Sequence, residues 1–278
     1  IGPLHNRTKD ISTFLPTQGL VVQGNGIDSI YPADWNNFAP RFGFAYQPTE
    51  SGGLVLRGGI GMFYDTPNLN PFLDNRPGNG GPNGVESNPI GAAPVSIFQV
   101  TNYQWQPESY IFPAAGSVCP TGSGCGSAIY NIFSVSQNFR TPYYFNYNLQ
   151  LEQSLGNKAV VQLGYVGSIG RKNLSLVDIN QPAPGFYPTD QALQAARPYY
   201  SSFPNFGVIN QIESIGNSEY NSFQAVFKVR NWRGFGGQFA YTWAHAMDDM
   251  SQYRGQLPQD SRSFAAEWGA SDYDTRHN

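Results

Sequence analysis

The chain has 278 residues, a formal net charge of −3 and 13% charged residues, with 15% aromatic residues, 31 glycines and 21 prolines. That charged fraction is about half of the share in an ordinary soluble domain. No Lys/Arg cluster is present, which argues against nucleic acid as a partner because phosphate binding needs a concentrated basic surface. No run of about 18 apolar residues is present, which excludes a transmembrane helix. The mean hydropathy of −0.39 still permits a membrane β-barrel, whose strands show lipid only every second residue.

Residues 1–35 are expected to be a loop or a lead-in to the first strand. The chain opens on Ile1-Gly2-Pro3 without a Met or a signal peptide and closes on His277-Asn278, so we expect a piece of a longer protein. Two strands are then predicted at Arg41–Gln47 and Leu54–Tyr64, with a short turn between them, because apolar and small or polar residues alternate in both.

A long connection rich in Gly, Pro and Asn follows over residues 66–128. It contains Cys119 and Cys125, whose spacing closes a small Gly-rich loop and suits a disulfide in an oxidising compartment. Two free thiols are the alternative. A metal is the weakest interpretation, since a zinc site would need two further ligands nearby.

The next elements include the most regular alternation of the chain. A strand is predicted at Ile129–Phe139, and Tyr144–Leu155 separates an apolar from a polar face as only a strand can. Gly156-Asn157 is a hairpin signal that leads into a strand over Lys158–Ser168. The loop after it, residues 170–205, has room for one short helix at Thr189–Ala196, capped by Thr189 or Asp190.

Three more strands are predicted before the end. A weak one at Val208–Ile215 is expected to form a hairpin with Tyr220–Arg230 through Gly216-Asn217, and Phe235–Ala246 follows. A last long loop is expected over residues 248–276. Strands of about ten residues thus alternate with short turns and long loops, which is typical of an antiparallel transmembrane β-barrel with periplasmic turns and extracellular loops. A secreted β-sandwich or propeller is the alternative.

The alternation also predicts which side chains point into the barrel. Charge facing lipid would cost roughly 2–4 kcal/mol at the midplane, so polar residues should face the lumen. The predicted lumen-facing residues are Arg57, Asn146, Asn148, Gln150, Glu152, Gln224 and Lys228. The predicted lipid-facing residues are Phe145, Tyr147, Leu149, Leu151, Phe223, Phe227, Phe239, Tyr241 and Trp243.

An ordered series of phrases resembles the barrel of TonB-dependent transporters of the Oar-like group. These phrases are Asn36–Tyr46, Leu56–Asp65, Val161–Gly167, Asp178–Pro182, Gly216–Gln224, Tyr241–Asp249 and Ser271–His277. The resemblance implies a barrel of about 22 strands, of which seven or eight would lie in this chain. It also implies a plug and a regulatory-like N-terminal domain that are absent from this sequence.

Few residues suggest chemistry. Asp272, Asp274 and Arg276 precede an expected strand and are interpreted as an ion-pair latch at the rim, with calcium binding as the alternative. His245, Asp248 and Asp249 match no standard metal spacing. No nucleophile, base or paired carboxylates stand in a recognisable frame, so neither an enzyme nor a cofactor is expected.

The sequence therefore predicts part of an outer-membrane, TonB-dependent transporter-like barrel. Its expected partners are outer-membrane lipid, the TonB complex through N-terminal parts, and an extracellular substrate such as an oligosaccharide or a peptide. Two other functions remain open, namely a non-transporting scaffold or adhesin barrel, and a secreted soluble β-protein that binds glycans.

Overall fold

The fold is dominated by one long antiparallel sheet, seen in a computed structural model that describes residues 2–5, 12–24, 26–50, 53–66, 129–204, 206–252 and 257–278. The sheet has eight strands in the order β11-β10-β9-β8-β7-β5-β4, and β6 pairs in parallel with β9 outside this path. The strands are β4 (Arg41–Tyr46), β5 (Leu54–Tyr64), β6 (Tyr130–Val135), β7 (Tyr143–Leu155), β8 (Ala159–Asp178), β9 (Phe206–Trp232), β10 (Phe235–Asp248) and β11 (Gly269–Ala270).

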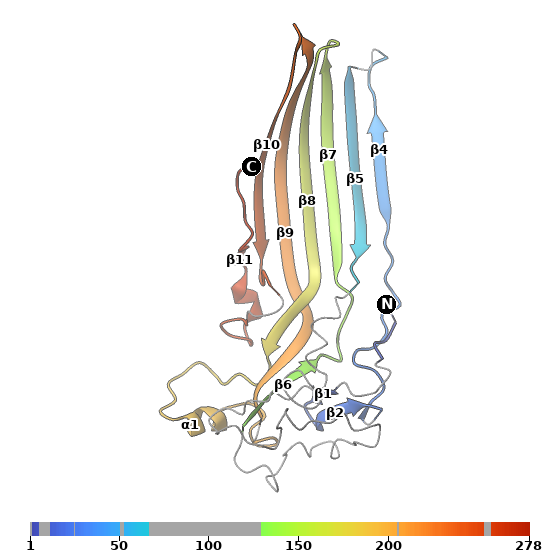
Figure 1. Ribbon diagram of the computed structural model, residues 1–278. Helices are drawn as coiled ribbons and strands as arrows, with labels where there is room; N and C mark the ends of the chain where they lie inside the picture. The colour runs from blue at the N-terminus through green and yellow to red at the C-terminus, as the bar shows by residue number, and fades with distance from the viewer. Residues whose placement is uncertain are drawn as a thin grey trace, which may run out of the picture.

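The sheet stays open, because its edges β4 and β11 do not pair with each other in the described part of the chain. Figure 1 shows the long strands running side by side, with short turns at one end and the remaining elements gathered at the other. We call these the turn end and the loop end. The predicted all-β, antiparallel barrel segment of seven or eight strands is confirmed.

The small elements lie at the loop end. The strands β1 (Ser12–Leu15), β2 (Gly19–Gln23) and β3 (Gly26–Ile27) form a separate three-stranded sheet. The helix α1 (Asp190–Ala195) begins after Thr189, whose hydroxyl accepts a hydrogen bond from the amide of Ala192 at 3.1 Å. A 3-10 turn spans Phe264–Glu267. The short predicted helix and its Thr189 cap are therefore confirmed.

Two strands are longer than predicted, and one predicted hairpin is wrong. β8 continues beyond Ser168 to Asp178, so the loop expected from residue 170 begins nine residues later. Val208–Ile215 and Tyr220–Arg230 are not a hairpin, because both belong to the single 27-residue strand β9. Gly216 lies in mid-strand opposite a break in the register of β8 around Lys172. A side chain at Gly216 would lie only 2.6 Å from the hydroxyl of Ser175.

A bulge at Lys172 separates the part of β8 that lies in the long sheet from its extension at the loop end. Lys172 has a φ of +57°, in the left-handed region that residues with a side chain rarely adopt. Such a bulge bends a strand and increases its local twist. In Figure 1, the lower parts of β8 and β9 bend and pass into the elements at the loop end. We call those elements the cap: β1–β3, β6, α1, and the parts of β8 and β9 on the far side of Lys172 and Gly216.

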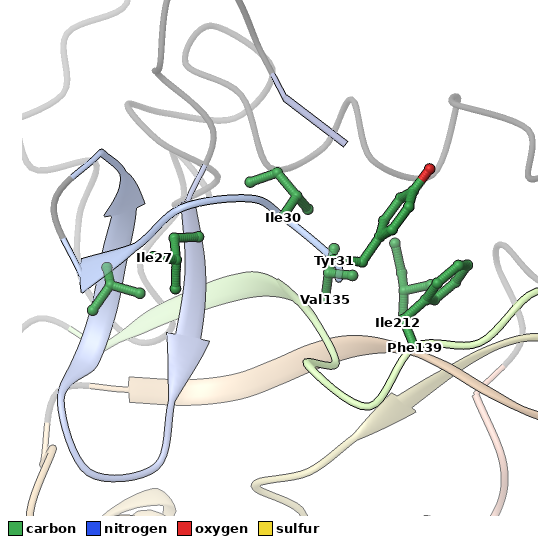
Figure 2. Close-up of a cluster of buried hydrophobic side chains, with 7 residues drawn as sticks. Ile27, Ile30, Tyr31, Val135, Phe139 and Ile212 are labelled. Atoms are coloured by element: carbon green, nitrogen blue, oxygen red, sulfur yellow. The ribbon is translucent and has the colours of Figure 1, made fainter. Parts of the chain in front are cut away.

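The cap has its own hydrophobic core. Val21, Ile27, Ile30, Tyr31, Val135, Phe139 and Ile212 are buried together, and Figure 2 shows that they come from the N-terminal segment, from the β6 region and from β9. The rings of Tyr31 and Phe139 stack with centroids 4.6 Å apart. Across β1, the hydroxyl of Thr13 donates to the carbonyl of Val135 at 2.9 Å. The described residues of this N-terminal segment therefore pack into the core of the cap, where the sequence predicted a loop or a lead-in to the first strand.

The three turns step along the strands in one direction. Leu56 pairs with β4 next to the first turn, and it lies opposite Leu151 on β7. The second turn begins only after Leu155, four residues further along β7. The third turn begins after Trp232, three residues beyond Val229, which lies opposite Ala159 next to the second turn. At about 3.4 Å per residue and about 4.8 Å between strands, turns in one plane require strands tilted by roughly 45–55°. Membrane barrel strands have a tilt of about 45°.

Candidate functional site

The register places all seven residues of the predicted lumen-facing set on one face of the sheet. Cross-strand partners share a face, and Arg57 lies opposite Gln150, Gln150 opposite Gly164, and Gly164 opposite Gln224. We call this the polar face. It continues onto β10 through Thr242, which lies opposite Gln224. Small and amide-bearing residues dominate it over six strands.

Glu152 is the centre of a polar network on this face. Its carboxylate accepts a hydrogen bond from the Nε2 amide of Gln162 at 2.8 Å and forms an ion pair with the Arg57 guanidinium at 3.1 Å. The Arg57 side chain is about half exposed. An exposed pair of this kind stabilises by at most about 1 kcal/mol, so its main effect is to hold both charges on this face.

A hollow lies at the middle of the polar face. It has a volume of about 240 Å³ and is bordered by residues of β7, β8 and β9, among them Asn148, Gln150, Gln162 and Gln224. Its floor includes Gly164, where an added side-chain carbon would meet nothing closer than 3.9 Å. Amide groups both donate and accept, so this surface suits hydroxyl-rich or peptide-like solutes and water.

All nine residues of the predicted lipid-facing set lie on the opposite face, which we call the aromatic face. Tyr147 lies opposite Gly167 and Gly167 opposite Asn221, while Phe223 lies opposite Trp243. Many of these side chains are exposed, for example Phe239 at 66% and Trp243 at 56%. Large apolar side chains exposed over six strands are unusual for a soluble surface and indicate an apolar environment.

A polar band crosses the aromatic face toward the loop end. The hydroxyls of Tyr147 and Tyr165 both donate to Oδ1 of Asn221, at 2.8 and 2.7 Å, and the Asn221 amide donates to Glu219 at 2.9 Å. His245 lies opposite Asn221 on β10. Eleven residues separate Asn221 from Trp232 at the turn end, and at a tilt of about 45° this spans about 26 Å, near the roughly 25 Å apolar band of membrane barrels.

Two residues of the predicted rim latch, Asp274 and Arg276, lie in contact beside β10. The Asp274 carboxylate accepts a hydrogen bond from the Ala246 amide at 2.8 Å, contacts the His245 ring at 3.1 Å and pairs with the Arg276 guanidinium at 2.6 Å. The Ala246 hydrogen bond and these two partners lower the pKa of Asp274 to about 2. The backbone amide of Asp272 donates to the Ser251 hydroxyl at 2.9 Å.

The carboxylates near His245 do not gather into a metal site. Asp249 receives hydrogen bonds from the amide and side chain of Asn217, at 2.7 and 2.8 Å, and Asp248 from the hydroxyl of Ser251 at 2.9 Å. Within the described ranges, no group of three or more His, Cys, Asp or Glu side chains is placed to hold a metal ion. Cys119 and Cys125 lie outside the described residues.

Sequence reasoning missed a buried network that holds the long loop after β8. Asn180 is fully buried, and its side chain donates to the carbonyls of Phe206 and Gly207, at 3.1 and 2.7 Å, and accepts from the Tyr199 amide at 2.9 Å. Asp178 pairs with Arg197 at 3.4 Å. Burial raises the pKa of Asp178, against hydrogen bonds from Ile209, Asn180 and Arg197. The only signal in the sequence was the phrase Asp178–Pro182.

The whole chain, residues 1–278, matches a family described as the outer membrane beta barrel domain. The chain belongs to this family. Its location is the outer membrane, and the alternative of a secreted soluble β-protein is thereby overturned. None of the described helices is long and apolar enough to span a membrane.

Comparison with curated proteins gives no match. Among solved structures, the chain is similar to the outer membrane transporter YddB from Escherichia coli, with 14% identity and a TM-score of 0.46 over 77% of this chain and 20% of that one. A mutant of the ferric enterobactin receptor PfeA from Pseudomonas aeruginosa has 13% identity and a TM-score of 0.41 over 79% of this chain and 26% of that one. The siderophore receptor PirA from Pseudomonas aeruginosa has 12% identity and a TM-score of 0.36 over 76% of this chain and 30% of that one. The chain thus spans less than a third of the length of these proteins.

Proposed function

We propose that this chain forms part of the wall of an outer-membrane, TonB-dependent transporter-like barrel. The polar face lines the lumen, the aromatic face contacts lipid, and the cap lies on the extracellular side with the short turns in the periplasm. The observation that carries the proposal is the placement of the predicted polar set and the predicted lipid-facing set on opposite faces of the sheet, in register from β5 to β10. The belt of about 26 Å and the tilt of the strands agree with it.

The polar face favours uptake of a polar solute. The hollow around Gly164 is bordered by amide side chains, and the charges of Arg57 and Glu152 neutralise each other. Such a wall offers many hydrogen bonds without strong selection for one sign of charge. An oligosaccharide or a peptide is therefore the proposed substrate class. The cap, with its own core, would act as a preformed receptor surface outside the membrane.

A scaffold or adhesin barrel is the second candidate. The packed cap supports it, because an adhesin also needs a preformed external surface. The difference is energy coupling, since a TonB-dependent transporter accumulates its substrate only when the inner-membrane machinery is present.

Uptake in matched strains tests the proposal. The protein, with its natural flanking sequence, is produced in a Gram-negative strain with or without a functional TonB, and uptake of fluorescently labelled oligosaccharides and peptides is measured. Accumulation that requires both the protein and TonB supports transport. Surface binding that is equal in both strains and is not followed by uptake supports an adhesin and overturns the transporter.

A further inference from the structure

The aromatic face ends in a basic corner where β7 and β8 leave the sheet for the cap. Arg171 lies opposite Tyr143 and therefore shares the aromatic face with it. Lys172 follows in the bulge, and its ammonium group lies 5.6 Å from the centroid of the Tyr143 ring. Tyr64 lies opposite Tyr143 on β5, with ring centroids 5.9 Å apart. Two cations and two tyrosines thus meet at the loop end of the sheet.

Arg140 adds a third cation from the segment before β7. Its side chain is exposed, as is that of Lys172. Both act on the carboxylate of Asp34, which is only 8% exposed and accepts a hydrogen bond from the Thr141 amide at 2.9 Å. Burial alone would raise the pKa of Asp34, but the Thr141 hydrogen bonds and the charges of Arg140 and Lys172 outweigh burial and lower it. Arg140 and Lys172 therefore lie near one buried anion while remaining open to an external one.

The three cations differ in how firmly they are held. The guanidinium of Arg171 donates to the carbonyls of Gly170 and Ser218, at 2.8 and 3.5 Å, whereas that of Arg140 donates to the carbonyl of Phe139 at 3.1 Å. Lys172 adopts the left-handed φ of +57°, although a glycine or asparagine would fit this conformation with less strain. Backbone strain of this kind is often kept where it positions a functional side chain. Here it brings an ammonium group to the edge of the aromatic face.

Apolar surface lies directly next to this corner, on the side of the turn end. Phe145 lies opposite Ile169 on β8 and opposite Met62 on β5, one step along the aromatic face from Tyr143. The Glu219 carboxylate lies in the same row, opposite Ile169, where it is bound by the Asn221 amide. A ligand seated here would place an anionic head among Arg140, Arg171 and Lys172 and an apolar tail over Phe145 and Ile169. A free anion would use only the first half of this surface.

We propose that Arg140, Arg171 and Lys172 form a binding site for the phosphate group of an outer-leaflet lipid, whose acyl chains cover Phe145 and Ile169. The site rests on the proposed function, because it requires the aromatic face to contact lipid. Basic side chains at the membrane interface attract anionic lipid heads, and tyrosines are enriched at the same level. The tilt of the strands agrees with this position. His245 on β10 is in register with Gly167 on β8 through Asn221, but tilted strands cross the membrane interface diagonally. The interface that passes His245 therefore meets β8 a few residues closer to the loop end, near Arg171.

The experiment compares lipids with and without phosphate. The protein is purified in a non-ionic detergent and titrated with bisphosphorylated lipid A or with the same lipid after removal of its phosphates, and bound lipid is counted by native mass spectrometry. The double variant Arg140→Gln/Lys172→Gln removes the two exposed charges. Lys158→Gln is the matched control, because Lys158 is an exposed lysine in the turn at the opposite end of β8.

We expect wild type and Lys158→Gln to prefer the bisphosphorylated lipid by roughly tenfold, equivalent to about 1.4 kcal/mol, and the double variant to lose this preference. Equal binding of both lipids by the wild type would mean that only acyl packing holds them and would overturn the site. So would unchanged preference in the double variant, or full competition by inorganic phosphate, which would indicate a free-anion site.

A second measurement separates failure of this site from failure of the proposed function. Brominated acyl chains quench tryptophan that contacts lipid, and the signal of Trp243 is obtained as the difference between wild type and Trp243→Phe in vesicles. Quenching of Trp243 without a phosphate preference overturns the lipid-phosphate site but leaves the barrel wall intact. No quenching of Trp243 overturns the lipid-facing assignment and the site with it.

Discussion

Tyr147 and Asn221 form a 2.8 Å hydrogen bond across a whole strand. They belong to β7 and β9, which are not neighbours, and β8 passes between them with Gly167 in register with both. The bond is possible because Gly167 has no side chain, so the Tyr147 ring lies over its backbone. An added side-chain carbon at Gly167 would overlap the Tyr147 ring. One glycine thus permits the polar band that crosses the aromatic face.

Gly167→Ala tests this relationship. The new methyl group must push the Tyr147 ring aside, which breaks its hydrogen bond to Asn221 and creates a packing conflict. We expect a loss of about 1–3 kcal/mol in the free energy of unfolding, measured by urea titration in detergent micelles. Gly164→Ala is the control on the same strand, since its methyl group would meet nothing closer than 3.9 Å. Equal effects of the two changes would contradict the proposed role of Gly167.

The assignment of the two faces predicts opposite outcomes for arginine at Phe227 and at Gln224. Phe227→Arg places a charge on the aromatic face, where the cost is roughly 2–4 kcal/mol if that face contacts lipid. Gln224→Arg places the same charge on the polar face, where water can solvate it. We expect Phe227→Arg to reduce assembly into membranes, measured as the heat-modifiable fraction on gels, and Gln224→Arg to assemble like the wild type. If both variants assemble equally well, the inside–outside assignment is wrong.

The strands of the sheet could be predicted because period-two alternation is a local property. Phe145 to Glu152 shows it without interruption, and the register then aligned the pattern across six strands. The continuity of β9 could not be predicted, because Gly216-Asn217 looks like a hairpin turn. What keeps Gly216 in mid-strand is the bulge at Lys172, and what fixes Asn217 is the carboxylate of Asp249, which is distant in sequence.

The cap and the basic corner could not be predicted either, because their residues are distant from one another in the sequence. Arg140, Lys172 and Asp34 come from three separate segments, and only the folded chain brings their charges together. The rim latch was half predictable, because Asp274 and Arg276 are close in sequence, whereas the contribution of His245 and the Ala246 amide depends on the pairing of β10 with the C-terminal segment.

Asn180 should be the residue that fixes the loop after β8. Asn180→Ala removes two hydrogen bonds to the carbonyls of Phe206 and Gly207 and one from the Tyr199 amide in a fully buried site. Each unsatisfied buried group costs about 1–3 kcal/mol, so we expect this loop to open locally while the long strands stay paired. Hydrogen exchange should increase severalfold over residues 179–204 and remain unchanged in β7. Gln191→Ala, an exposed change in α1, is the control and should alter neither region.

The rim latch predicts an acid-sensitive contact between β10 and the C-terminal segment. The pKa of Asp274 is lowered to about 2, chiefly by the hydrogen bond from the Ala246 amide and further by His245 and Arg276, against an ordinary value of 3.8. A carboxyl group whose folded pKa is lowered stabilises the fold above its unfolded pKa and loses this contribution as pH falls through the folded value. We therefore expect the stability contributed by Asp274 to be complete above about pH 4 and to disappear toward pH 2. In Asp274→Asn this part of the pH dependence should be absent, measured as the difference between the unfolding midpoints of the two proteins from pH 5 to pH 2. A difference that stays constant over that range would show that the Asp274 charge does not hold the latch.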